Sequence, residues 1–269
     1  MKEQYIMARR PWHTICIEQP ARSYVSCAGA VFYKILRKRS TMNRSIWDTT
    51  LMRRLSALDT IYLRVDRAQA EFRGKAEQNG NSISCPPRCG TCCVHFVPDA
   101  TPVEAEKLAY FLLTEKPEII DHFFARREES LAIDAACPFW NQDKPGQNCM
   151  IYPGRPLICR LFGFCSVVDK HGEPAFALCR QMPNLDGSEL RSFTGKKVLE
   201  ETFGDTPPPM VDFSRAIAAL DPCDSGQRFK ITEALPPALA KVSLVLSLAS
   251  ASAGPEAIES DSSGFMAAV

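Results

Sequence analysis

The sequence predicts a mainly α-helical fold with irregular loops, in which helices pack around a small cysteine-rich domain. Two observations predict the helices: apolar residues recur at steps of three or four along several stretches of the 269-residue chain, and no alternating strand pattern extends beyond four or five residues. A third observation predicts the cysteine-rich domain, because eight of the twelve cysteines fall between residues 85 and 179.

The first predicted element is a long amphipathic helix from Trp47 to about Gly74, with Asp48 as its expected N-cap. Its apolar face consists of Leu51, Leu55, Leu58, Tyr62, Val65 and Phe72. This spacing places the apolar side chains on one side of a helix. Residues 45–79 are therefore expected to form a helical lead-in to the cysteine-rich part.

Two shorter helices are predicted within the cysteine-rich part. Thr101-Pro102-Val103-Glu104 has the pattern of a capping box with proline at the first helical position, and the helix is expected to end near Leu113. A second helix is expected to open at Pro117. Its apolar face consists of Ile119, Ile120, Phe123 and Phe124.

A helical C-terminal region is predicted over residues 181–250. Its candidate helices are Ser188–Phe203, Asp212–Leu220 and a last helix that opens at Pro236-Pro237 and ends near Ser250.

The two ends of the chain are predicted to be disordered. Residues 1–44 have no sustained apolar period, and residues 251–269 are rich in alanine, serine and glycine. The apolar run Cys27–Leu36 precedes its basic residues, which is the reverse of a signal peptide. Val242–Ala249 is shorter than the roughly 20 residues that a membrane helix needs. We therefore expect a cytoplasmic protein without a membrane partner.

The charge balance argues against a nucleic-acid partner. The chain has 32 lysines and arginines against 31 acidic residues, a formal net charge of +1, and the basic residues are spread along it. No pattern of catalytic residues stands out either. The cysteines are therefore the candidate functional residues.

The first cysteine set is Cys85, Cys89, Cys92 and Cys93. Cys89-Gly-Thr-Cys92 has the two-residue spacing that lets two thiolates from one tight turn reach one metal ion. Cys93 follows directly, and because neighbouring side chains usually point apart, we expect Cys92 and Cys93 to have different roles.

The second cysteine set is Cys137, Cys149, Cys159 and Cys179. Cys165 is left open as a ligand. Thiolates gathered around a metal carry excess negative charge, which Arg155 and Arg160 are expected to compensate from just outside the ligand shell. In a reducing cytoplasm, clustered cysteines of this kind indicate a metal site rather than disulfides.

Two kinds of metal centre fit an all-cysteine ligand set. An iron–sulfur cluster, expected to be 4Fe-4S, would serve a redox or cluster-assisted role with a redox partner that the sequence does not identify. A structural zinc site would instead staple the loops and present a surface to a protein partner. Cysteine ligands serve both metals, so both interpretations remain open.

The combined motif order resembles one family. It comprises Cys85 followed by Cys89-Gly-Thr-Cys92-Cys93, a Thr-Pro-Val-Glu helix start, Cys137-Pro-Phe and Cys149-x-Ile-Tyr-x-x-Arg-Pro-x-x-Cys-Arg-x-Phe. Over residues 80–180 it is similar to the YkgJ-type cysteine-cluster family, known for its zinc- or iron-chelating CxxCxxCC domain. The resemblance implies bacterial origin and a metal centre; no enzymatic activity is carried over.

The two cysteine sets are separated by a helical insertion of roughly 40 residues, a length that can fold back as a helical hairpin. We therefore expect both sets to meet in space and to form one composite centre. Closing a site with the first set alone would require both Cys92 and Cys93 to turn inward.

Overall fold

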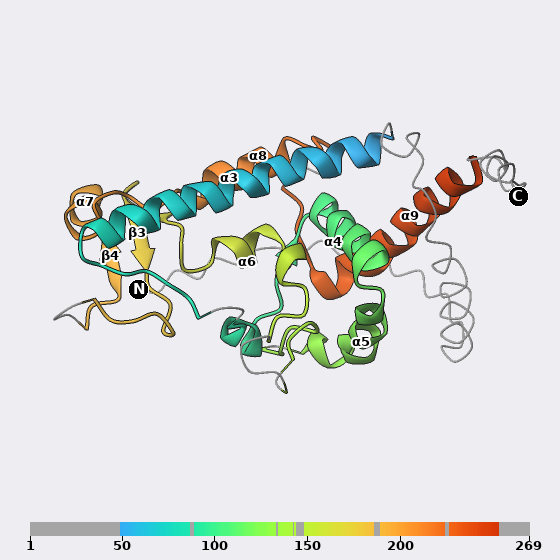
Figure 1. The fold of residues 1–269 in the computed structure, drawn as a ribbon, viewed down its shortest axis with the longest axis horizontal. Helices are drawn as coiled ribbons and strands as arrows, with labels where there is room; N and C mark the ends of the chain where they lie inside the picture. The colour runs from blue at the N-terminus through green and yellow to red at the C-terminus, as the bar shows by residue number, and fades with distance from the viewer. Residues whose placement is uncertain are drawn as a thin grey trace, which may run out of the picture. The chain divides into compact units, whose positions relative to one another are not determined.

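The computed structural model describes residues 49–86, 89–132, 134–141, 143, 148–185, 189–223 and 226–252. The predictions for residues 1–44 and for nearly all of 251–269 lie outside this part of the chain. Within it, α-helices dominate and the strands are two to four residues long, so the predicted mainly α-helical fold with irregular loops is confirmed (Figure 1). The proposed segment boundaries stay a prediction.

Helix α3 spans Thr50–Gln78 and has the predicted apolar face. The six residues of that face are all buried. The helix is capped by Thr49, whose side chain accepts a hydrogen bond from the Met52 amide at 3.2 Å, rather than by Asp48. It also continues past Gly74, because nothing in the helix pattern there requires a stop and Asn79 provides the C-cap.

Helix α4 spans Pro102–Glu115 and opens with the predicted capping box between Thr101 and Glu104. Helix α5 spans Glu118–Arg127, directly after Pro117. The 3₁₀ turn η2, Glu129–Leu131, follows it. Only part of the expected apolar face of α5 is buried: Ile119 and Phe123 are, whereas Phe124 is exposed.

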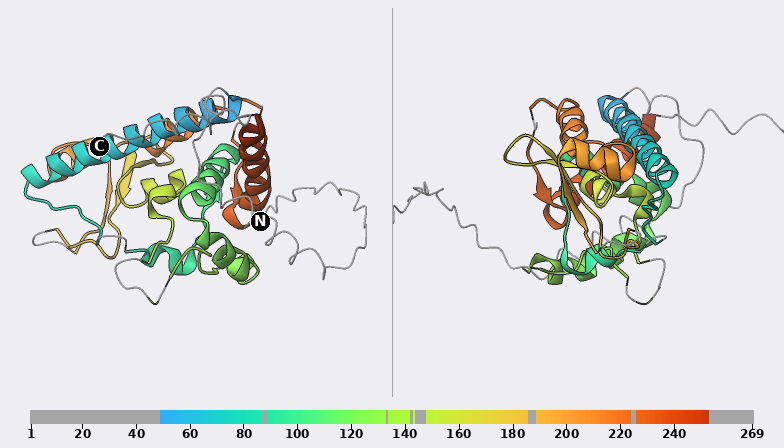
Figure 2. Two further views of the ribbon diagram at one scale, coloured as in Figure 1. Left: turned by 45° about the vertical axis from the view of Figure 1, so that its right-hand side comes forward. Right: turned by 90° about the vertical axis from the view of Figure 1, so that its left-hand side faces the viewer.

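Helix α9, Ile231–Ser252, packs along α4, and the left view of Figure 2 shows the two helices side by side. Strands β1, Asp99–Ala100, and β5, Phe229–Lys230, pair antiparallel just before the two helices and bring their starts together.

Helix α9 begins earlier than predicted, with Pro236 and Pro237 inside it. A proline lacks the amide that would bond to the carbonyl four residues earlier. For Pro236 that carbonyl belongs to Thr232, and it accepts a hydrogen bond from Arg127 Nε at 2.7 Å instead. A partner on α5 thus allows the helix to extend through the prolines.

The early start also lengthens the apolar run of α9. Ile231–Ala251 has a mean hydropathy of 1.5 and is, by length and composition alone, long enough to cross a membrane, so the expectation of a run confined to Val242–Ala249 is wrong. The first half of the helix is buried in the protein core, where Ile231, Leu235 and Val242 are each fully buried. Core helices of soluble proteins meet the same criterion, so this helix is weak evidence for a membrane span.

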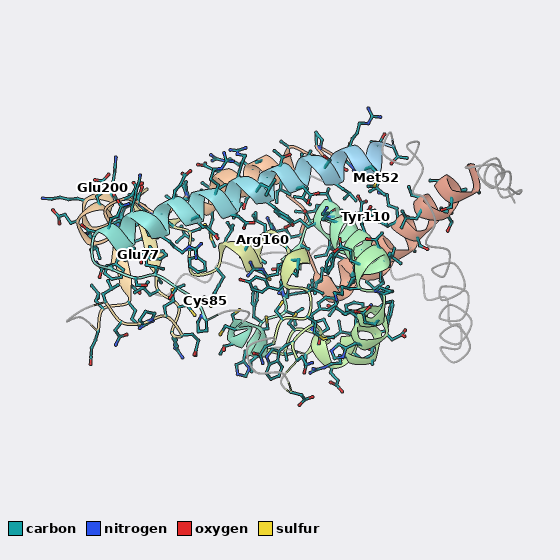
Figure 3. The ribbon with its side chains drawn as sticks, viewed as in Figure 1. Met52, Glu77, Cys85, Tyr110, Arg160 and Glu200 are labelled. Atoms are coloured by element: carbon teal, nitrogen blue, oxygen red, sulfur yellow. The ribbon has the colours of Figure 1, made fainter. Side chains whose placement is uncertain are left out.

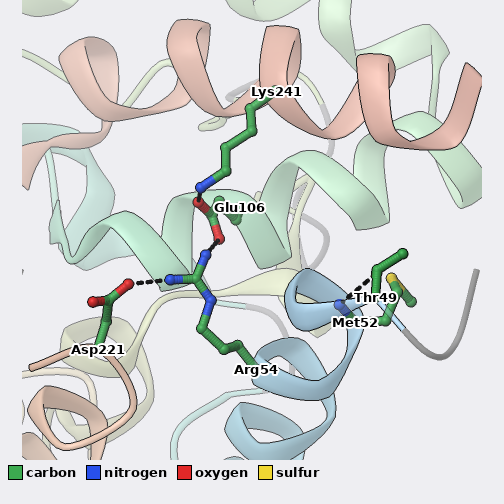
Figure 4. Close-up of polar contacts among 6 residues, drawn as sticks. All are labelled: Thr49, Met52, Arg54, Glu106, Asp221 and Lys241. Atoms are coloured by element: carbon green, nitrogen blue, oxygen red, sulfur yellow. Dashed lines mark hydrogen bonds and ion pairs between the residues drawn. The ribbon is translucent and has the colours of Figure 1, made fainter. Parts of the chain in front are cut away.

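Charged side chains join α3, α4 and α9 in one network (Figure 4). The buried carboxylate of Glu106 pairs with Arg54 at 2.9 Å and with Lys241. Arg54 also pairs with Asp221. A buried carboxylate with two cationic partners ties the three helices in one register.

The other end of α3 packs on a small sheet that the sequence did not reveal. Strands β2, Val167–Val168, β3, Pro174–Ala177, and β4, Ser192–Thr194, are antiparallel in the order β2-β3-β4. The predicted helix over 188–203 is therefore wrong in its first part.

Helix α7, Lys196–Phe203, follows β4. The rings of Phe72, Phe176 and Phe193 surround Phe203 with centroid distances of 5.7, 5.4 and 5.0 Å. Helix α8, Met210–Ala218, lies at the helix predicted over 212–220 and contacts α3. The long helix α3 is thus the element that connects the helical end to the sheet end.

Candidate metal centre

The first cysteine loop turns sharply at Gly90 and continues as the 3₁₀ helix η1, Thr91–His95. Gly90 has a left-handed backbone with φ of +64°, which favours glycine. A Cβ atom at this position would lie 2.6 Å from the Asn148 Cβ and 3.3 Å from the Cys149 amide nitrogen. The glycine is therefore required both for the turn and for the close approach of the second cysteine loop.

The residues of the second set come from several short elements. The Cys137 amide donates to the carbonyl of Cys93 at 2.8 Å, which joins the two sets directly. Cys149 pairs with Trp140 in an isolated bridge. Cys159 lies in helix α6, Leu157–Leu161, and Cys179 follows β3.

The side chains of both sets meet around Cys93. The Cys93 thiol is in hydrogen-bonding contact with the side chains of Cys137, Cys149 and Cys92. It is only 9% exposed, and Cys137 is 4% exposed. Cys159 lies close enough to Cys137, Cys149 and Cys92 for their charges to act on it.

The remaining cysteines gather around Cys85, which Figure 3 shows on the loop that follows α3. The Cys85 side chain is hydrogen-bonded to Cys89, and Cys179 and Cys92 are its other cysteine neighbours. Cys85 and Cys92 are exposed, whereas Cys89 and Cys179 are half-buried. This part of the cysteine cluster therefore faces solvent.

Contacts between the thiols shift the pKa values of the cysteines in the cluster in opposite directions. The pKa of Cys93 is raised because its thiol is hydrogen-bonded to Cys137, Cys149 and Cys92. The contact with Cys93 lowers the pKa of Cys92 to about 7 and also lowers the pKa of Cys149. Thiolates are the form that binds metals, so the lowered pKa values favour metal binding by these two sulfurs.

Arg155 supplies positive charge beside this cluster. Its guanidinium helps to lower the pKa values of Cys92 and Cys149. It also stacks on the ring of Tyr152, with the Cζ atom 3.7 Å from the ring centroid. Its Nε is buried without a hydrogen-bond partner in the protein. The arginine is therefore held by stacking while its charge faces the thiols.

Arg160, by contrast, binds the backbone of the loop that precedes helix α6. It donates to the carbonyls of Pro153 at 2.6 Å and Arg155 at 3.0 Å. Its guanidinium lies over the ring of Tyr62, 4.1 Å from the centroid, and next to Asp66 of α3. Its contacts thus fix the backbone that presents Arg155.

Glu104 supports the cysteine cluster through contacts that the sequence did not reveal. Besides capping α4, its fully buried carboxylate accepts from the Leu157 amide at 2.5 Å and from the Tyr62 hydroxyl at 3.2 Å. Leu157 is the first residue of α6, which carries Cys159. The capping box was visible in the sequence, but the partner from α6 is a tertiary contact.

Other candidate side chains lie apart from the cluster contacts. Cys165 is buried and accepts from Gln69 Nε2 at 3.5 Å, and burial raises its pKa to about 11. Cys223 is exposed. Cys16 and Cys27 lie outside the described residues.

The sulfurs of the cluster are gathered but do not yet form a coordination sphere. Among the residues that the structure describes, no three Cys, His, Asp or Glu side chains are arranged to hold a metal ion as they stand. The donor set nevertheless fits a soft metal, because its described members are cysteines from adjoining loops. The ligand role of each cysteine stays a prediction.

The comparisons with known proteins agree with this donor set. Residues 84–181 match the model of the CxxCxxCC family, described as "Putative zinc- or iron-chelating domain". The matched segment contains all eight cysteines of the two sets, and the predicted resemblance to this domain family is confirmed over that segment. No curated protein and no solved structure matches the chain.

Proposed function

We propose that this chain, which carries a domain of the CxxCxxCC family, binds an iron–sulfur cluster through thiolates from both cysteine sets. A cluster of the 4Fe-4S type would supply one-electron transfer or assist a reaction. The proposal rests on the contacts of the Cys93 thiol. These contacts join Cys92 of the first set to Cys137 and Cys149 of the second. A reducing cytoplasm would keep these thiols available.

The chain's own residues would tune such a centre in two ways. The buried Cys93 and Cys137 would shield one side from water, while the exposed Cys85 and Cys92 leave the other side open to a redox partner. Arg155 would offset part of the excess negative charge of the thiolates, because no acidic partner neutralises its guanidinium among the described ion pairs.

A structural zinc site is the second candidate. The first cysteine loop has little core of its own, since Cys93 is the only buried residue of η1. Loops of this kind gain stability when a metal ties them together. The zinc site would then present the surrounding surface to a protein partner.

Isolation without oxygen should distinguish the two metals. We expect a brown protein with visible charge-transfer absorption, and with iron and acid-labile sulfide in equal amounts. The measurements are metal analysis, sulfide analysis and an absorption spectrum of the purified full chain. A colourless protein that contains stoichiometric zinc would support the zinc module instead, and a protein that contains neither metal would refute both.

A further inference from the structure

A cavity of about 380 Å³ lies beside the first cysteine loop, and none of the described residues that line it is a cysteine. Its volume falls at the lower end of the range for small-molecule sites. We infer that this cavity binds a small organic ammonium ion with a short apolar chain. The inference does not depend on which metal the cysteines bind.

Three segments that are distant in the sequence form the cavity: the end of η1, the turn η2 with the loop that follows it, and the start of α9. The Ile231 amide donates to the Pro98 carbonyl at 2.9 Å, which fixes the start of α9 against the segment that follows η1. The lining residues on which the inference rests are His95, Phe96, Leu131, Asp134, Thr232 and Glu233.

The unpaired charge at the cavity is negative. Asp134 and Glu233 are exposed, and neither has an ion pair or a side-chain hydrogen bond among the described residues. Lys230 also lines the cavity, but its ammonium lies 3.0 Å from the Asp99 carboxylate and donates to the Val97 carbonyl at 3.1 Å. Two free carboxylates beside a neutralised lysine favour a cationic ligand that donates hydrogen bonds.

The hydroxyl of Thr232 is a second, independent indication of a ligand. Thr232 lines the cavity and is fully buried, yet its Oγ1 has no hydrogen-bond partner in the protein. The other hydroxyl of the lining is satisfied, because Ser130 donates to the Ala136 carbonyl at 2.8 Å. Buried polar groups are almost always hydrogen-bonded. An ammonium group in the cavity would supply the donor that Thr232 lacks.

Apolar side chains form the rest of the wall and indicate a ligand with a hydrocarbon part. Phe96 and Leu131 are 38% and 50% exposed although both are large and apolar. Covering them removes apolar surface from water, and the face of the Phe96 ring also attracts cations.

The lining favours an organic cation over a metal ion. In the part of the chain that the structure describes, no three His, Cys, Asp or Glu side chains are arranged to hold a metal. The cavity with its two carboxylates therefore lacks the ligand number of a metal site, whereas an ammonium ion needs only hydrogen-bond acceptors.

Three probes of equal length test the charge preference on the full chain as isolated: butylammonium, butan-1-ol and butyrate. Ligand-observed nuclear magnetic resonance and calorimetric titration measure binding of each. We expect butylammonium to bind at least about tenfold more tightly than the other two probes, as expected for a charge-assisted hydrogen bond that they lack. No binding of butylammonium, or equal binding of butyrate, would overturn the inference.

Replacement of one carboxylate locates the site. Asp134 has a left-handed backbone with φ of +58°, which asparagine tolerates as well as aspartate does, so Asp134→Asn should leave the melting temperature unchanged. We expect it to weaken butylammonium binding by about fivefold. The control is Glu129→Gln in η2, because this glutamate is 76% exposed and does not line the cavity. Equal binding by the two variants would place the ligand elsewhere and overturn the inference.

Thr232→Val separates a binding role of the hydroxyl from a structural one. Because Oγ1 has no partner in the protein, valine should leave stability to unfolding unchanged or raise it, while butylammonium binding weakens. A destabilised variant that binds butylammonium as tightly as the unaltered chain would show that the hydroxyl serves the fold, and would contradict its assignment to the ligand.

Discussion

Complete removal of the metal is expected to lower the melting temperature by about 10 °C. Cys93 is the only buried residue of η1, so the metal supplies much of the stability of the first cysteine loop. A linked binding energy of about 3 kcal/mol already produces a shift of this size in a domain of 150–250 residues. Calorimetry on anaerobically purified protein, before and after chelation, measures the effect.

The helical core provides the internal control for metal removal. Helices α3, α4 and α9 are held by apolar packing and by the Glu106 network, neither of which uses a cysteine of the cluster. Far-ultraviolet circular dichroism at 25 °C should therefore stay helical after chelation. An unchanged melting temperature, with metal analysis showing that removal is complete, would contradict a metal-dependent loop structure.

Glu104→Ala is expected to destabilise the protein by about 3 kcal/mol or more, the usual cost of breaking a buried charged contact. The carboxylate accepts from the Thr101 amide and hydroxyl at 2.9 Å, from the Tyr62 hydroxyl and from the Leu157 amide. Its removal leaves these donors buried without an acceptor. Denaturant unfolding measures the loss.

Glu118→Ala is the matched control, because this glutamate also lies in the first turn of a helix but is exposed and pairs only loosely with Lys116, at 3.7 Å. Its replacement should change stability by less than about 0.5 kcal/mol. Equal effects of the two substitutions would show that Glu104 is not the anchor that its contacts indicate. Because Leu157 begins the helix that carries Cys159, Glu104→Ala should also weaken metal retention.

The features predicted correctly from the sequence depend on local patterns. The apolar face of α3 follows from the helical period, and the capping box of α4 from residues three apart. Both are determined by neighbours within one helix. The order of the cysteines likewise predicted the family, because the motif spacing is itself the signal.

The features that the sequence did not predict depend on distant partners. The early start of α9 requires Arg127 to bond the Thr232 carbonyl that Pro236 leaves free. The sheet of β2, β3 and β4 consists of strands too short to show alternation. The grouping of Cys85 with Cys179, and of Cys93 with Cys137 and Cys149, likewise arises from tertiary contacts rather than from spacing.

The most direct test of the central claim asks whether thiolates from both cysteine sets hold the same metal. Cys93→Ser, Cys149→Ser and the double variant are purified without oxygen, and bound metal per chain is measured for each, with Cys223→Ser as control. A shared site predicts that each single variant loses the same fraction of metal and that the double variant loses no more. Losses that add in the double variant would show that the two sets bind separate metals.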